Sequence, residues 1–133
     1  MKLYGVIACP VAHSLSPALH NRAFQARRID AVFLPFLVEP TKLGDFFKLV
    51  EPLRLAGFSV TIPHKLRVIR YLDSVDSLAK RIGAVNTVYR CKGKLYGANT
   101  DVLGVIAPLE KRMTIRKSAV LVAGHGGAAR GRP

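Results

Sequence analysis

Short apolar runs alternate along the chain with segments of helical spacing. Three runs, over Lys2–Ala8, Ala31–Val38 and Gly57–Pro63, are rich in β-branched and aromatic residues, which is typical of strands buried in a sheet. Pro35 lies inside the second run and has no N–H to donate to a neighbouring strand. We therefore expect this second strand at an edge of the sheet.

Helical spacing follows several of these runs. Ser16 before Pro17 predicts a helix start, with the serine as N-cap and the proline at the first helical position. Further helices are predicted over residues 42–50 with Thr41 as cap, over 64–72, over 76–82, and after Thr100, where Pro108 should bend the helix.

The remaining elements complete an alternating order. Strands are predicted over 84–90 and 94–100, with a Lys-Gly-Lys turn between them, and over 118–124, where the chain enters a glycine-rich turn. Alternating strands and helices favour an α/β fold with a mostly parallel sheet flanked by helices.

Composition is that of one folded domain with a basic surface. Of the 133 residues, 50% are hydrophobic and 22% are charged, which is typical of a globular protein. The formal net charge is +13, and six basic residues but no acidic ones occur from Lys111 onward. No compact basic block interleaved with aromatic residues and no nucleic-acid-binding pattern occurs. We therefore expect solvated basic helix faces and no nucleic-acid partner.

Other partner classes are also disfavoured. The longest apolar run, Ala31–Val38, is too short to cross a bilayer, and the first residues lack the features of a signal peptide. This pattern favours a cytoplasmic protein with no membrane partner. Cys9 and Cys91 lie far apart without metal-type spacing, so we predict reduced thiols and no metal site.

Polar residues gather where the predicted strands end. In open α/β sheets, ligands bind beyond the carboxyl ends of the strands. The strand in "GFSVTIPHK" would deliver a threonine and a lysine to such a crevice, and the loops after the other strands would add serine, asparagine and aspartate. The candidates are Ser14, Ser16, Thr61, Lys65, Asn86 and Asp101.

Simpler roles stay open for several candidates. From the residues alone, Lys65 can be a solvated lysine of a first helical turn, and Asp101 a carboxylate favoured by a helix dipole. Asn86 can be a turn residue. We assign no role to His13 or His64, since each is more often a loop or helix-start histidine than an acid–base catalyst.

Four motifs together resemble one enzyme family. "AHSLSPALHNRAF", "GFSVTIPHK", "IGAVNTV" and "GANTDVLG" occur in the order and approximate spacing of the shikimate dehydrogenase family. The resemblance covers nearly the whole chain, although Ser59 stands where many family members have asparagine. It implies an N-terminal substrate domain and a C-terminal cofactor domain, which together reduce 3-dehydroshikimate to shikimate with NADPH in aromatic amino-acid biosynthesis.

The resemblance also implies roles for the candidates. Reducing a ketone builds negative charge on the carbonyl oxygen, so a positioned cation or acid must meet that oxygen and deliver a proton. Lys65 is implied as this catalytic group, paired with Asp101. Ser14 and Ser16 resemble the serines that bind the substrate carboxylate, while Thr61, Asn86 and Asp101 resemble the groups that read the ring hydroxyls, with Thr100 as a further candidate.

The last stretch, "VLVAGHGGAARG", resembles the glycine-rich turn of a dinucleotide-binding domain. The implied cofactor residues are Gly124, Gly126, Gly127 and Ala128. A strand–helix–strand unit needs roughly 30 residues, whereas 16 remain from Ser118. We therefore expect residues 1–112 to form a shikimate-binding catalytic domain and residues 113–133 a truncated Rossmann-type beginning, with an incomplete NADP site.

Three readings of function follow. The first is the substrate-binding domain of an NADP-dependent shikimate dehydrogenase, with no detectable turnover by this chain alone. The alternatives are a non-catalytic fragment that binds shikimate and a quinate/shikimate dehydrogenase. The preference between NADP and NAD and the formation of a homodimer stay open.

Overall fold

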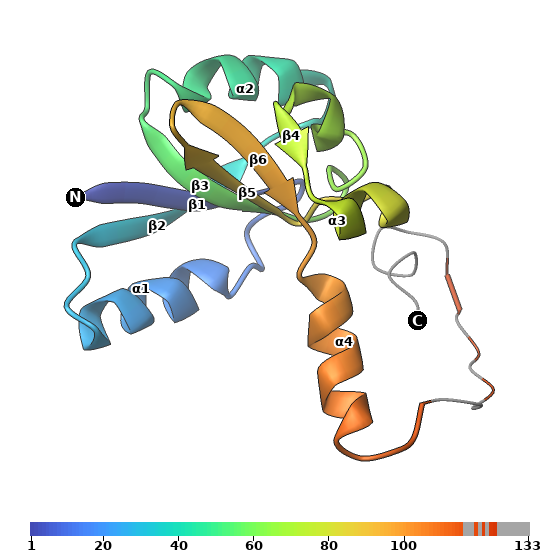
Figure 1. Cartoon of the computed structure of the whole chain (residues 1–133). Helices are drawn as coiled ribbons and strands as arrows, with labels where there is room; N and C mark the ends of the chain where they lie inside the picture. The colour runs from blue at the N-terminus through green and yellow to red at the C-terminus, as the bar shows by residue number, and fades with distance from the viewer. Residues whose placement is uncertain (116–118, 120, 122, 125–133) are drawn as a thin grey trace.

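A computed structural model of the chain describes residues 1–115, 119, 121, 123 and 124. Six strands form one sheet in the order β2-β1-β3-β5-β6-β4, with a helix on each of its faces and the last helix projecting away from it (Figure 1). The strands are β1 Lys2–Ala8, β2 Ala31–Leu37, β3 Leu55–Val60, β4 Ser74–Val75, β5 Thr87–Cys91 and β6 Lys94–Ala98. The helices are α1 Ser16–Ala26, α2 Leu43–Val50, α3 Ser77–Ile82 and α4 Asp101–Glu110, with short 3-10 helices at Pro40–Lys42 and Val68–Tyr71.

The predicted α/β class is confirmed, and the sheet is mixed. Strands β2, β1 and β3 pair in parallel, as do β4 and β6, whereas β5 is antiparallel to both β3 and β6. The antiparallel hairpin follows from the turn at Lys92 and Gly93, whose φ angles of 49° and 77° suit a two-residue hairpin loop. This arrangement puts the start of β5 at the same edge as the ends of β3 and β6.

The core lies between the sheet and α2. Phe46 of α2 meets Phe58 of β3 edge to face, with 5.2 Å between the ring centroids, and both are buried. On the opposite face, α1 covers β1 and β2 (Figure 1), where His20 stacks on Phe33 at 4.3 Å. The sheet thus lies between α1 and α2, and burial of apolar surface on both of its faces stabilises this arrangement.

A side chain of α1 forms hydrogen bonds with the backbone of the edge strand β2. Asn21 donates its Nδ2 to the carbonyl oxygen of Phe33 at 2.9 Å, and its Oδ1 accepts the N–H of the same residue at 2.8 Å. Pro35 lies in this strand, and the predicted edge position is confirmed.

Several local predictions were wrong. Ser16 is the first residue of α1 and not its N-cap, and no side chain caps this helix. The Ser16 N–H donates a long hydrogen bond of 3.4 Å to Ser14 Oγ. Thr41 lies in a 3-10 helix, and α2 begins after it without a side-chain cap. Residues 64–72, which join β3 to β4, form turns and a 3-10 helix, and His64 at their start is buried in the core.

Helix α4 is the last helix among the residues that the structure describes. Helix α4 continues through Pro108 and has one buried residue, Val102. The strand predicted over 118–124 falls partly outside the described residues. Among the described helices, none is long and apolar enough to cross a membrane.

Candidate functional site

A pocket of about 520 Å³ lies at the sheet edge where β1, β3 and β6 end and β5 begins. All six residues predicted to bind substrate line it. These residues are Ser14, Ser16, Thr61, Lys65, Asn86 and Asp101. The expectation that ligands bind beyond the carboxyl ends of the strands therefore predicted where the pocket lies. Because β5 runs antiparallel to β3 and β6, Asn86, which precedes β5, lies beside residues that follow the other strands.

Lys65 and Asp101 form the charged centre of the pocket. Lys65 Nζ donates to Asp101 Oδ2 at 2.7 Å, although the residues are 36 positions apart in the chain. Their side chains are only 17% and 28% exposed, so solvent screens the pair less than it would a surface ion pair. The pair expected from the sequence is thus in direct contact.

Backbone hydrogen bonds fix the lysine. After β3, the N–H of His64 donates to the carbonyl of Thr61 at 2.8 Å and closes a turn that carries Lys65 toward the pocket. The Lys65 carbonyl accepts the N–H of Val85 at 2.8 Å, one residue before Asn86. Two chain segments that supply pocket residues are thereby joined.

Asn86 links the remaining polar groups. Its Nδ2 donates to Asp101 Oδ1 at 2.7 Å and to Thr100 Oγ1 at 2.8 Å. Its Oδ1 accepts from Thr87 Oγ1 at 2.8 Å and from the Thr100 N–H at 3.0 Å. Both carboxylate oxygens of Asp101 are therefore occupied, one by an ammonium and one by an amide.

The pocket suits a small ligand that is rich in oxygen. The hydroxyls of Ser14, Ser16 and Thr61 can donate or accept, Lys65 donates, and Asp101 accepts. Because these groups surround one cavity, a ligand with several hydroxyls can be bound on different sides at once. A single cation beside a carboxylate also provides a means to move a proton.

Sequence reasoning missed some residues of the pocket. Cys9, which directly follows β1, and Thr87, which begins β5, both line it. Their positions at strand ends were the signal that could have found them. It also missed Asn99, which is buried between the loop before β5 and the start of α4.

His64 is fully buried and does not line the pocket. Its Nε2 lies 2.7 Å from the Val38 carbonyl oxygen, so this nitrogen carries the proton and donates. Nδ1 is buried and has no hydrogen-bond partner in the part of the chain that the structure describes. Burial lowers the pKa of His64 below 6.5, with a further lowering by Arg67 and an opposing contribution from the bond to Val38.

We expect His64 to make the folded state less stable in acid. Its lowered pKa means that the unfolded chain binds the proton more readily, so stability falls as pH decreases below the ordinary value of 6.5. The slope from this one group is at most about 1.4 kcal/mol per pH unit. Urea denaturation at a series of pH values measures it.

His64→Gln is the matched variant, because glutamine can still donate to Val38 without titrating. Its unfolding free energy should depend less on pH than that of the original protein in the window just below pH 6.5. Parallel curves for the two proteins would show that His64 does not cause the dependence.

The predicted cofactor residues fall at the end of the described chain. Gly124 has a φ of 128°, in the region that favours glycine, as a tight glycine-rich turn requires. Gly126, Gly127 and Ala128 lie outside the described residues.

Together, these observations define an α/β domain with a polar pocket that holds an ammonium–carboxylate pair. The family described as "Shikimate dehydrogenase substrate binding domain" matches residues 6–88. The chain belongs to this family, and the resemblance noted in the sequence is confirmed.

Known relatives agree with this assignment. A shikimate dehydrogenase (NADP(+)) from Geobacillus kaustophilus is 51% identical over 132 residues, or 98% of this chain and 48% of the relative. The solved shikimate dehydrogenase from Aquifex aeolicus has a TM-score of 0.94 and 42% identity, over 98% of this chain and 50% of that one.

A structure from Thermus thermophilus, in complex with NADP(H) and shikimate, has a TM-score of 0.89 and 37% identity, again over 98% of this chain and 50% of that one. The chain thus spans about half the length of the curated relatives it matches.

Proposed function

We propose that this chain is the substrate-binding half of an NADP-dependent shikimate dehydrogenase, which interconverts 3-dehydroshikimate and shikimate in the cytosol. The observation that carries the proposal is the 2.7 Å contact between Lys65 and Asp101 in a pocket lined by hydroxyl groups. The Thermus thermophilus relative in complex with NADP(H) and shikimate supports it. In this proposal residues 1–112 form the substrate domain and residues 113–133 begin the cofactor domain.

Ser14 and Ser16 are proposed to bind the substrate carboxylate. They lie just before and at the start of α1, where unpaired backbone N–H groups and the helix dipole favour negative charge. The Ser16 hydroxyl does not cap the helix, so it remains available to donate to a carboxylate oxygen. The carboxylate would thus be bound on the side of the pocket contributed by the loop after β1.

Thr61, Asn86 and Asp101 are proposed to bind the ring hydroxyls, and Asn86 would do so by giving up its bond to Thr100 Oγ1. They lie on the side of the pocket formed by the ends of β3 and β6 and the start of β5. Asp101 can accept a hydrogen bond from a ring hydroxyl while it keeps its bond to Lys65, because each carboxylate oxygen has more than one lone pair. The substrate would therefore be oriented from two sides.

The same pair performs the proton transfer. When bound, NADPH supplies the hydride that reduces the carbonyl carbon. Lys65 delivers a proton to the carbonyl oxygen, and in the reverse direction an unprotonated Lys65 accepts the proton of the substrate hydroxyl. Asp101 holds the amine in place through their 2.7 Å contact.

Titration calorimetry of this chain with shikimate tests the binding step. We expect saturable binding, and a rise in melting temperature with ligand, because a ligand selective for the folded state stabilises it. Absence of both effects would refute binding by this chain. Quinate in the same experiment distinguishes the alternative substrate, since the tighter ligand identifies the preference.

Catalysis is tested by following NADP reduction with shikimate in two proteins. One is this chain, and the other is a fusion in which it continues into the C-terminal half of the Geobacillus kaustophilus relative. We expect turnover by the fusion. Tight shikimate binding without turnover by the fusion would favour the non-catalytic alternative.

Ser14→Ala and Ser16→Ala should each weaken shikimate binding by about tenfold, because each removes one hydrogen bond to a charged group. Calorimetry measures the loss. The methyl ester of shikimate is the control ligand: its neutral ester accepts weaker hydrogen bonds, so the substitutions should affect its affinity less. Equal losses for acid and ester would contradict the assignment of the serines to the carboxylate.

A further inference from the structure

Asn99 is a buried polar residue that the roles above do not use. It is 3% exposed and does not line the pocket. Its Nδ2 donates to the Ala84 carbonyl at 2.9 Å, and its Oδ1 accepts the Asp101 N–H at 3.0 Å. Both hydrogen-bonding ends of the side chain are therefore satisfied by backbone groups.

These two bonds connect the segments that supply the pocket amide and the pocket carboxylate. Ala84 lies two residues before Asn86, and Asp101 lies two residues after Asn99. The Asn86 side chain in turn donates to the Asp101 carboxylate at 2.7 Å. One buried side chain thus fixes the backbones on both sides of that contact.

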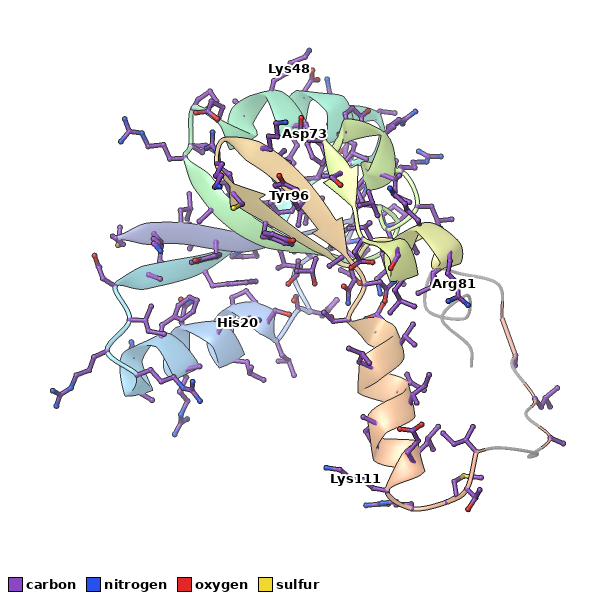
Figure 2. All side chains as sticks on the ribbon, viewed as in Figure 1. His20, Lys48, Asp73, Arg81, Tyr96 and Lys111 are labelled. Carbon is purple, nitrogen blue, oxygen red and sulfur yellow. The ribbon has the colours of Figure 1, made fainter. Side chains whose placement is uncertain are left out.

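Hydrogen bonds to Asn86 and Asn99 hold the start of α4, whereas the rest of the helix has few constraints. Val102 is the buried residue of this helix, whereas Leu103 and Val105 are 64% and 54% exposed. The helix projects away from the sheet, with Lys111 just beyond its far end (Figure 2). Its first turn must therefore determine where the carboxylate of Asp101 lies.

Asn99 also accepts one of the first N–H groups of this helix, although Thr100 and not Asn99 is its N-cap. The Thr100 side chain makes no capping bond, and the first N–H groups of a helix have no partner within the helix. Asn99 Oδ1 accepts one of them, that of Asp101. The side chain that bonds the first N–H of the helix is thus the one that joins the helix to the loop before β5.

We propose that Asn99 is a positioning residue, which places the Asp101 carboxylate against Lys65 and the substrate. The proposal rests on the proposed function for its ligand, but the placement of the ion pair can be measured without any ligand. Asn99 does not line the pocket, and its hydrogen bonds go to Ala84 and Asp101, so we expect its effect on binding to act through Asp101.

Asn99→Ala should weaken shikimate binding by about tenfold. In an Asp101→Ala background the same substitution should change affinity less than about twofold, because the group it positions is gone. Calorimetry of the four proteins measures this coupling. Independent losses that multiply, or an unchanged affinity for Asn99→Ala, would overturn the inference.

Asn21→Ala is the matched control for lost stability. Asn21 also bonds one backbone N–H and one backbone C=O, but it does so with Phe33 of β2, away from the pocket. We expect Asn21→Ala to leave shikimate affinity unchanged at a temperature where both variants are folded. A matching loss of affinity in Asn21→Ala would assign the effect to general destabilisation.

Asn99→Ser provides a rescue. A serine hydroxyl at position 99 can accept the Asp101 N–H, but it lacks the amide that donates to Ala84. It should recover part of the affinity lost in Asn99→Ala. Recovery supports positioning through the helix start, and affinity as low as that of the alanine variant would contradict it.

The Lys65 ammonium signal in ¹⁵N NMR separates this inference from the proposed function. An ammonium held by a carboxylate exchanges its protons more slowly with water than a free one does. In the protein without ligand, this signal should persist in Asn21→Ala and broaden in Asn99→Ala. If shikimate fails to bind but the signal behaves in this way, the function fails and the positioning role stands; a signal unaffected by Asn99→Ala overturns the positioning role itself.

Discussion

Replacing Lys65 with methionine is expected to lower kcat of the fusion by about 10³-fold, the loss typical of a missing proton donor. Methionine keeps an unbranched side chain of similar length but has neither charge nor donor. Rates of NADP reduction at saturating shikimate measure the loss in kcat.

Lys80→Met is the control for the lysine substitution. Lys80 lies exposed on α3 and does not line the pocket, so kcat should stay within about twofold of the original value. Turnover by Lys65→Met equal to that of this control would exclude Lys65 as the proton donor. Retained shikimate binding with lost turnover is the result expected for a group that acts mainly in the chemical step.

Replacing Asp101 with asparagine should lower kcat/KM of the fusion by about 10²-fold. The carboxylate accepts from Lys65 with one oxygen and from Asn86 with the other, and an asparagine has a single oxygen to offer both. One partner must lose its bond, and the ammonium loses its counter-charge in a position only 17% exposed. Steady-state kinetics with varied shikimate measure the change.

Asp45→Asn provides the matched comparison for the carboxylate. Asp45 accepts from Lys48 at 3.0 Å, but both side chains are largely exposed, and such surface pairs contribute little. Its kinetics should equal those of the original fusion. An equal decline in both variants would mean that removal of any carboxylate, and not the position of Asp101, explains the result.

The location of the site was predictable because strand ends follow from apolar runs. Thr61 and Lys65 come directly after the apolar run of β3, and Ser14 and Ser16 come shortly after β1. Once those strands are parallel, these residues must share an edge of the sheet. Predicting where the pocket lies therefore required only the pattern of strands and helices. Proposing chemical roles for its residues required the resemblance to the family.

Other features depend on contacts that the sequence pattern does not encode. The stretch after His64 has helical spacing, yet it forms a 3-10 helix because His64 is drawn into the core beside Val38. Asn99 looks like an ordinary loop asparagine until its two backbone partners are seen. Long-range hydrogen bonds of this kind override local propensity.

The closed edge of β2 has a consequence for encounters between copies of the protein. At Phe33 the amide of Asn21 already fills the places where an incoming strand would bond, and Pro35 offers no donor farther along. A neighbouring chain that approaches this edge would find the Phe33 backbone already bonded and no donor at Pro35, so β2 is a poor template for fibre growth.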